Sequence, residues 1–290
     1  MRWHACVLVV LALLAAGCVG HPGTNRSFDV TAAEAGQALR EMAASPQTLD
    51  RPVVVLGGLN DPGFSPAHLA AQVRRVTGDP RTLTFTFGPF ESVDACARRV
   101  VRKVERRFPG DDPTATAEVD VIAFSMGGLV ARAAAAPARP SASAPKGAAD
   151  AAPDRTPRRL RIARLFTISS PHRSAAMAAA LPALPLPGHV QADLRPGSSF
   201  LRALGEREVV EERGGQSYET CAYVRLGDTV VGQANASLPG RPPHWLSTPP
   251  LQDPHHLAFC DPRIVADIAR RLRGETPFAA DPPEPLPRLE

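Results

Sequence analysis

Short apolar runs alternate with amphipathic stretches along most of this sequence. Pro52–Leu56, Val119–Phe124 and Ile162–Ser169 are rich in aliphatic residues and carry few polar side chains. Such runs are typical of strands that are buried on both faces, as in parallel sheets. Because parallel neighbours need a crossover connection, usually a helix, the alternation predicts an α/β fold with a mostly parallel central sheet and helices on both faces.

The remaining stretches have the spacing of helices or of further strands. Val93–Phe108 is strongly amphipathic, with its apolar residues on one helical face and Arg and Lys on the other. Helices are also predicted at Asp29–Ala44, Pro66–Val76, Gly127–Ala136 and Pro262–Leu272, and strands at Thr82–Phe87 and Cys221–Leu226.

The charge of the chain is nearly balanced. Its 290 residues include 33 basic and 29 acidic ones, a net charge of +4, and the basic residues are spread along the sequence. Nucleic-acid-binding proteins usually concentrate positive charge on one face. We therefore expect no nucleic-acid partner.

The N-terminal segment has the features of an export signal. An apolar run from Cys6 to Ala16 follows Arg2; it is shorter than the ~20 residues of a membrane-spanning helix but suits a secretory signal. The five residues that end at Cys18, Leu-Ala-Ala-Gly-Cys, resemble the bacterial lipobox, although Ala15 stands where Leu is commoner. The resemblance implies lipidation of Cys18 and a protein that is exported and anchored to the bacterial cell envelope, on its periplasmic or outer-surface side. An ordinary signal peptide cut at an Ala-x-Ala-like site is the alternative.

These segments suggest the domain boundaries. We predict a signal peptide over residues 1–17, a tether and N-terminal helix over 18–50, a folded domain over 51–273 and a Pro-rich tail over 274–290. Residues 137–159 are mostly Ala, Pro, Arg and Ser and offer little to bury, so we expect a loosely packed surface insertion there.

A serine stands where one apolar run gives way to a helix. Ser125 follows the strand predicted at Val119–Phe124, and small residues, Ala123 and Gly127, stand two positions to either side. A turn sharp enough to expose the serine hydroxyl brings backbone segments together, so only small side chains fit there. The helix N-terminus then directs its amides at an oxyanion formed nearby. This pattern favours a nucleophile over a structural turn.

The segment Ala-Phe-Ser-Met-Gly-Gly-Leu-Val-Ala-Arg around Ser125 resembles the nucleophile elbow of the α/β-hydrolase superfamily, and is particularly similar to that of bacterial lipases and esterases. Ala123 replaces the commoner Gly, a variant familiar in lipases. The resemblance extends over roughly Pro52–Leu272 and implies an α/β-hydrolase fold, a Ser-His-Asp mechanism and no cofactor. The last strand that it implies is weakly marked, since only His244–Ser247 fits it.

The resemblance also implies that an acid and then a histidine follow the serine. Asp228, in Leu-Gly-Asp-Thr-Val-Val, resembles the acid turn of lipases, although Gly-Asp is also ordinary turn chemistry. Asp193 and Asp253 are the alternative acids. Lipase-like chains place the base about seven residues before the proline that opens the last helix, which favours His255 over His256. The two histidines could instead bind a metal, but no other ligands stand near them, so we expect no metal site.

Two backbone amides are expected to form the oxyanion hole. One belongs to Met126, the residue after the nucleophile, and the other comes from the loop after the first strand. That loop, Gly57–Asn60, resembles the His-Gly-x segment of the family, with Gly57 in place of His, and by this match Leu59 supplies the second amide. A tight turn with no catalytic part is the alternative.

Two further segments follow the next strand. Leu165–Ser174 resembles a lipase segment that shapes the pocket wall, so we assign His172 to that wall and not to the general base. Residues 175–190 are apolar and Pro-rich, and they suit either a cap over an acyl pocket or a plain connection. Of the cysteines beyond the signal, Cys221 and Cys260 are a weak candidate for a disulfide.

The residues and the resemblance together predict a serine hydrolase that cleaves carboxylic esters, of lipids or other acyl compounds, in a lipoprotein. An amidase or thioesterase of the same fold is one alternative, because the same triad performs all acyl transfers. A catalytically inactive hydrolase fold that serves as an envelope interaction protein is the other, since a fold by itself does not determine function.

Overall fold

The computed structural model describes residues 23–88, 90–136, 158–176, 190–213, 218–238 and 240–287. The predicted signal peptide, Cys18, nearly all of the insertion predicted at 137–159 and most of 175–190 lie outside the described residues. Within the described ranges, no helix has the length and apolar character of a membrane span.

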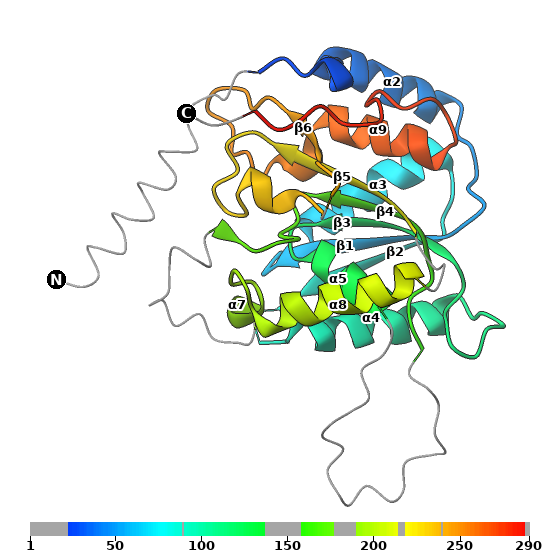
Figure 1. Ribbon diagram of the computed structural model, residues 1–290. Coiled ribbons are helices and arrows are strands. Elements are labelled where there is room, and N and C mark those ends of the chain that lie inside the picture. The colour runs from blue at the N-terminus through cyan, green and yellow to red at the C-terminus, as the bar shows by residue number, and fades with distance from the viewer. Residues whose placement is uncertain are drawn as a thin grey trace, which may run out of the picture.

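Six strands form one parallel sheet in the order β2-β1-β3-β4-β5-β6 (Figure 1). The strands are β1 (Val53–Leu59), β2 (Thr82–Phe87), β3 (Val119–Phe124), β4 (Ile162–Ile168), β5 (Glu219–Arg225) and β6 (His244–Leu246). The weakly marked last strand is thus present, but it has only three residues.

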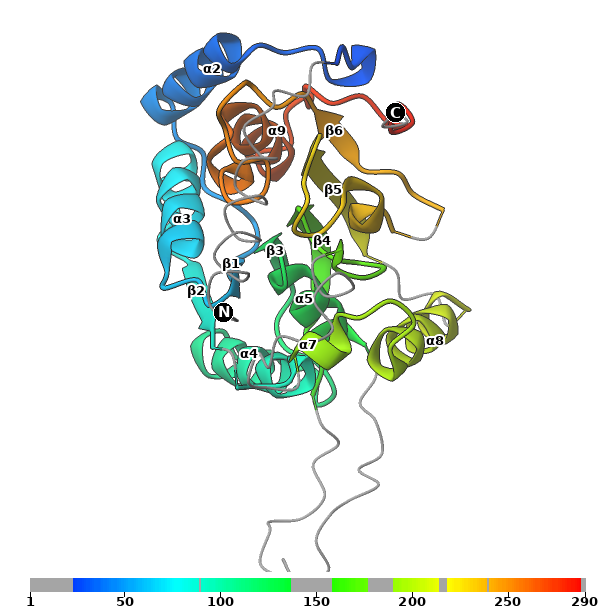
Figure 2. The same ribbon diagram turned by 90° about the vertical axis from the view of Figure 1, so that its left-hand side faces the viewer.

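Helices cover both faces of this sheet (Figures 1 and 2). One face carries α2 (Ala32–Ala44), α3 (Phe64–Thr77) and α9 (Pro262–Leu272), and the other carries α4 (Val93–Arg107), α5 (Gly127–Ala135), α7 (Val190–Asp193) and α8 (Ser199–Arg213). Short 3-10 turns are η1 (Arg26–Phe28), η2 (Gln233–Ala236) and η3 (Ala258–Cys260). This architecture confirms the predicted fold class, an α/β-hydrolase-like fold.

Strand β1 shows why an unbroken apolar run was needed. Val53 and Val55 belong to the core beneath α2, α3 and α9, whereas Val54 and Leu56 belong to the core beneath α4 and α5. Successive side chains of a strand point to opposite faces, and here both faces are covered. A polar residue at any of these positions would be buried without a partner.

Both ends of the described chain pack beside β6. Asn25 Nδ2 donates a hydrogen bond to the Trp245 carbonyl (2.7 Å), and Trp245 Nε1 donates to the Glu284 carbonyl (3.1 Å). The Ala280 amide donates to the Ser27 carbonyl (2.6 Å). The described parts of the segments predicted as tether and tail are therefore in contact with the domain.

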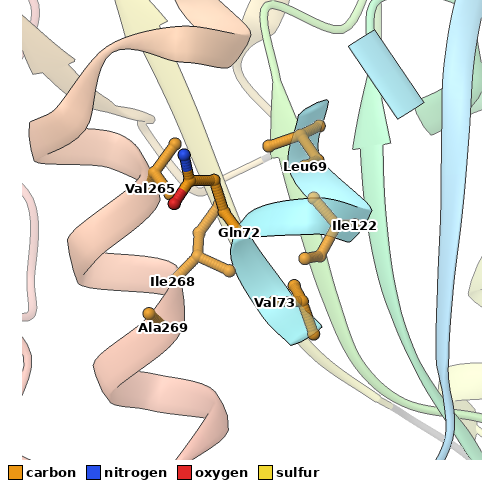
Figure 3. A pocket seen from close by; sticks show the side chains of 7 residues that line it. All are labelled: Leu69, Gln72, Val73, Ile122, Val265, Ile268 and Ala269. Carbon is orange, nitrogen blue, oxygen red and sulfur yellow. The ribbon is translucent and has the colours of Figure 1, made fainter. Parts of the chain in front are cut away.

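A small internal cavity lies between α3, β3 and α9 (Figure 3). Its volume of about 10 Å³ admits at most a water molecule. The side chains around it are apolar except for Gln72, which reaches from α3 toward Val265 and Ile268. Among the described residues, nothing offers a hydrogen bond to the buried Oε1 atom of Gln72.

We expect Gln72→Met to raise the free energy of unfolding by about 1 kcal/mol, because it replaces an unpaired buried oxygen by an apolar group of similar shape. Urea denaturation measures this change. Gln37→Met on the exposed face of α2 is the matched control and should change stability by less than about 0.5 kcal/mol. Unchanged or lower stability of the Gln72 variant would mean that its oxygen has a partner.

Candidate active site

Ser125 stands in a strained turn between β3 and α5. Its φ of 51° lies in the left-handed region, a backbone conformation that residues other than glycine rarely adopt. Its backbone amide donates to the Ile168 carbonyl (2.9 Å), which ties the turn to the end of β4. Such a conformation costs on the order of 1–3 kcal/mol and persists only where the surroundings impose it.

The two glycines that follow Met126 are required by close contacts, with backbone atoms at Gly127 and with a side chain at Gly128. A Cβ atom on Gly127 would lie 2.7 Å from the Leu56 carbonyl oxygen and 2.8 Å from that of Gly57. One on Gly128 would lie 2.4 Å from Ser170 Oγ. Helix α5 can therefore begin two residues after Ser125 only because its first two residues are glycines.

The structure brings Ser125, His255 and Asp228 together at the edge of the sheet where the strands end, here called the carboxyl edge. His255 Nε2 lies 3.1 Å from Ser125 Oγ, and His255 Nδ1 lies 2.9 Å from Asp228 Oδ2. Asp228 follows β5 and His255 lies between β6 and α9, so three separate connections supply the three side chains. Ser125 is partly exposed, whereas the other two are buried.

Asp228 is held as a carboxylate. Burial by itself raises its pKa, but attraction to His255 and hydrogen bonds from His255 and the Val231 amide (2.9 Å) outweigh burial, so the net pKa lies below the ordinary value. The pairing therefore adds stability above a pH of about 3.8 and loses it as the pH falls through the lower folded pKa. An ionised Asp228 accepts a hydrogen bond from Nδ1–H of His255, which leaves Nε2 as the unprotonated nitrogen that can accept a proton from Ser125.

The alternative residues lie elsewhere. His256 Nδ1 lies 2.9 Å from Asp253 Oδ2, and the His256 side chain is exposed. The hydrogen bond with Asp253 raises the pKa of His256 despite partial burial. Asp193 lies beside the start of α4, with Oδ2 3.5 Å from the Val93 amide. The hydrogen-bonded chain to Ser125 thus includes neither His256 nor either alternative acid.

Of the segments predicted to donate to an oxyanion, Met126 adjoins Ser125 in the chain and the end of β1 passes close to it. Within the described part of the chain, the Met126 amide donates to no protein acceptor. Strand β1 pairs with β3 only as far as Leu56, and the chain then continues past the serine, where a Cβ atom on Gly58 would lie 3.3 Å from Ser125 Cβ. Leu59 follows directly, and its part in an oxyanion hole stays a prediction.

His172 is buried between β4 and α5, and its predicted place in a pocket wall stays a prediction. Its Nε2 lies 3.0 Å from Thr167 Oγ1 and its Nδ1 lies 3.3 Å from the Arg132 guanidinium. Burial, reinforced by the charge of Arg132, holds the pKa of His172 well below its ordinary value. Arg132 in turn pairs with Glu208 of α8 (2.5 Å), so His172 stays neutral and fixed in place.

Arg225, the last residue of β5, is a residue that sequence reasoning missed. Its buried guanidinium donates to Gln252 Oε1 (2.6 Å) and to the Asp253 carbonyl (3.4 Å), and its Nε lies 3.5 Å from Asp261 Oδ2. These three partners span the loop that carries His255, so Arg225 is placed to position that loop. The signal was available, because an arginine inside the apolar run Cys-Ala-Tyr-Val-Arg-Leu must be buried with partners.

We expect Arg225→Met to lower kcat by about ten- to a hundredfold, because loss of these contacts lets His255 move relative to Ser125. The Tm should fall as well. Arg164→Met is the matched control, since Arg164 pairs with the buried Asp120 (2.6 Å) near the opposite end of the sheet. The control should lower Tm without lowering kcat per folded molecule. Equal kcat in both variants would contradict a positioning role for Arg225.

The predicted disulfide is not formed. Cys221 and Cys260 are both free: Cys221 is buried in β5, and Cys260 Sγ donates to the Leu257 carbonyl (3.2 Å). Burial raises the pKa of Cys221 to about 12, so its thiol is inert. Over the described ranges, no group of three or more His, Cys, Asp or Glu side chains gathers as a metal site would require.

Comparisons with known proteins find structural likeness only. No protein-family model and no curated protein sequence matches the chain. The mature form of Bacillus licheniformis lipase BlEst2 is similar at 14% identity and a TM-score of 0.47, over 74% of this chain and 89% of the lipase. Phospholipase PlaB from Legionella pneumophila is similar at 15% identity and a TM-score of 0.40, over 62% of this chain and 39% of the phospholipase.

Proposed function

We propose that this chain is a serine hydrolase that cleaves carboxylic esters, of lipids or other acyl compounds. The observation that carries the proposal is the chain of two hydrogen bonds from Ser125 through His255 to Asp228. The strained φ of Ser125 supports it further, because backbone strain of this kind is concentrated at functional sites.

The geometry suits acyl transfer through a covalent intermediate. Ser125 Oγ attacks the ester carbonyl carbon while His255 Nε2 takes the hydroxyl proton, and Asp228 stabilises the imidazolium. The Met126 amide, joined by that of Leu59, stabilises the oxyanion. His255 then gives its proton to the leaving alcohol, and the acyl group stays on Ser125. Water, deprotonated by His255, releases the acid and restores the serine.

The alternative functions differ in what they require of the site. An amidase or thioesterase needs the same three side chains, so a panel of matched ester, amide and thioester substrates separates these activities. An inactive interaction protein has no need of the strained serine or of a buried carboxylate aligned with a histidine. The intact hydrogen-bonded chain therefore favours an enzyme.

The cellular location is a second part of the proposal. The lipobox-like segment supports export and lipidation of Cys18, which would anchor the domain to the cell envelope. Anchoring needs more than one acyl chain, because a single chain binds a membrane only reversibly. A membrane-anchored ester hydrolase would meet lipid esters directly.

A fluorophosphonate probe tests the proposed activity. An active serine displaces fluoride from the probe and keeps a phosphonyl group on its oxygen. We expect peptide mapping by mass spectrometry to locate this adduct on Ser125. Folded protein that remains unlabelled, or that carries the adduct on another residue, would contradict the proposal.

A further inference from the structure

Four large apolar side chains are exposed in the described part of the chain. Phe64, Phe90, Leu251 and Leu257 are 74%, 70%, 81% and 40% exposed. Exposed apolar side chains that gather on one surface mark a site of contact with a partner or a lipid phase. Whether these four residues form such a site depends on whether they lie on the same side of the molecule.

All four belong to one edge of the sheet. Phe64 begins α3 after β1, Phe90 lies between β2 and α4, and Leu251 and Leu257 lie between β6 and α9. Connections that run from a strand to the next helix lie where the strands end, so the segments that carry these four residues lie at the carboxyl edge, as Ser125 does. The turn η3 contacts α3, which brings the loop with Leu257 beside the helix that starts at Phe64.

The charges near these residues do not suit an acidic partner. In the sequence, Asp61, Glu91 and Asp253 stand within three residues of one of the four and no Lys or Arg does, and in the structure Arg99 pairs with Glu91 (2.8 Å), so no excess of positive charge marks this edge. Binding at such a surface is favoured by the removal of apolar area from water and not by attraction of anionic groups. A lipid phase of low charge fits it better than an anionic surface.

The N-terminal segment reaches the domain at the same edge. A Cβ atom on Gly23 would lie 3.1 Å from side-chain atoms of Leu226 and of Trp245. Leu226 directly follows β5 and stands two residues before Asp228. In Figure 1 the dark-blue start of the described chain lies on the side where the strands end.

The link from Cys18 to Gly23 is short. Its five residue steps reach at most about 18 Å, even when fully extended. A domain of this size has a radius of gyration of about 17 Å, so it is roughly 40 Å across. An anchor at Cys18 therefore keeps the carboxyl edge closer to the bilayer than the opposite edge.

We propose that the carboxyl edge docks on the leaflet that holds the Cys18 anchor, through Phe64, Phe90, Leu251 and Leu257. Ser125 then opens toward acyl esters of that same membrane. The substrate part of this inference rests on the proposed function, and the anchor on the proposed lipidation. The docking itself needs no catalysis.

Bromine quenching of tryptophan fluorescence tests the docking independently of activity. Phe64→Trp and Arg75→Trp place the reporter at the two ends of α3, about 16 Å apart along the helix. The full lipidated protein is reconstituted in vesicles of brominated phosphatidylcholine, and the signal of Trp245, common to both variants, is subtracted. We expect the reporter at position 64 to be quenched and the one at position 75 to stay unquenched, with no change in 0.5 M NaCl.

Other outcomes of this experiment overturn the inference. Equal quenching of both reporters, or quenching of neither, means that the carboxyl edge does not face the lipid. Quenching at position 64 that disappears in high salt means that charge, not apolar contact, holds the edge to the membrane. Loss of quenching with rising protein density, together with dimers in solution, means that a second copy of the chain covers the edge.

A second measurement links docking to the substrate. Phe64→Ser combined with Phe90→Ser should lower hydrolysis of phosphatidylcholine in vesicles by roughly tenfold or more, since the docked protein loses two aromatic rings that would enter the lipid. Hydrolysis of a water-soluble short-chain ester should not change. Equal loss with both substrates would overturn the link, whereas absence of both activities in the unaltered protein would contradict the proposed function and leave the quenching result standing.

Discussion

Replacing Ser125 by alanine is expected to lower kcat for ester hydrolysis by on the order of 10⁴- to 10⁶-fold. The variant retains His255 and Asp228 but has no oxygen to acylate. The alanine side chain fits the space of the serine, so the fold should persist. Steady-state kinetics with a short-chain ester, alongside a thermal melt, measure both quantities.

Ser92→Ala is the matched control for this substitution. Ser92 caps α4, where its side chain accepts a hydrogen bond from the Ala95 amide (3.2 Å). Loss of the cap should cost about 1 kcal/mol of stability without lowering kcat. Turnover by Ser125→Ala within tenfold of the unaltered protein would rule out Ser125 as the nucleophile.

The neighbouring histidines should respond very differently to the same change. His255→Ala is expected to lower kcat by on the order of 10³-fold or more, because Ser125 loses its general base. His256→Ala should leave kcat within a few-fold, since its imidazole pairs with Asp253 on the surface. Parallel kinetics of the two variants, at one pH and on folded protein, provide the comparison.

The pH dependence of stability offers an internal check on His256. Its pKa is raised in the folded protein, so its pairing with Asp253 adds stability below a pH of about 6.5 and loses it as the pH rises through the folded pKa. His256→Ala should therefore destabilise the protein in weakly acidic solution more than in alkaline solution. Equal destabilisation at both pH values would contradict this pairing. In the kinetic comparison of the two histidines, a large loss of kcat with His256→Ala and a small one with His255→Ala would reverse the assignment of the base.

Local patterns were sufficient for the central elements. β2, β3 and α9 have the bounds predicted from sequence, because a buried strand needs an unbroken apolar run and a helix needs its apolar residues on one face. Helix α8 was not predicted, since part of it is strongly charged and it is held by its own residues, such as Leu204, packing on a core that distant segments form. The three-residue strand β6 is too short to be marked by a pattern of its own.

Periodicity and small residues express local requirements, so the sequence alone revealed which segments are buried and where the chain must turn sharply. It marked Ser125 and narrowed the acid and the base to a few candidates. The three-dimensional arrangement was needed to show that His255 meets Asp228 while His256 meets Asp253, that Arg225 contacts the loop with His255, and that Cys221 and Cys260 stay free. These contacts join residues from separate connections, and the order of the strands, which no local pattern encodes, places those connections side by side.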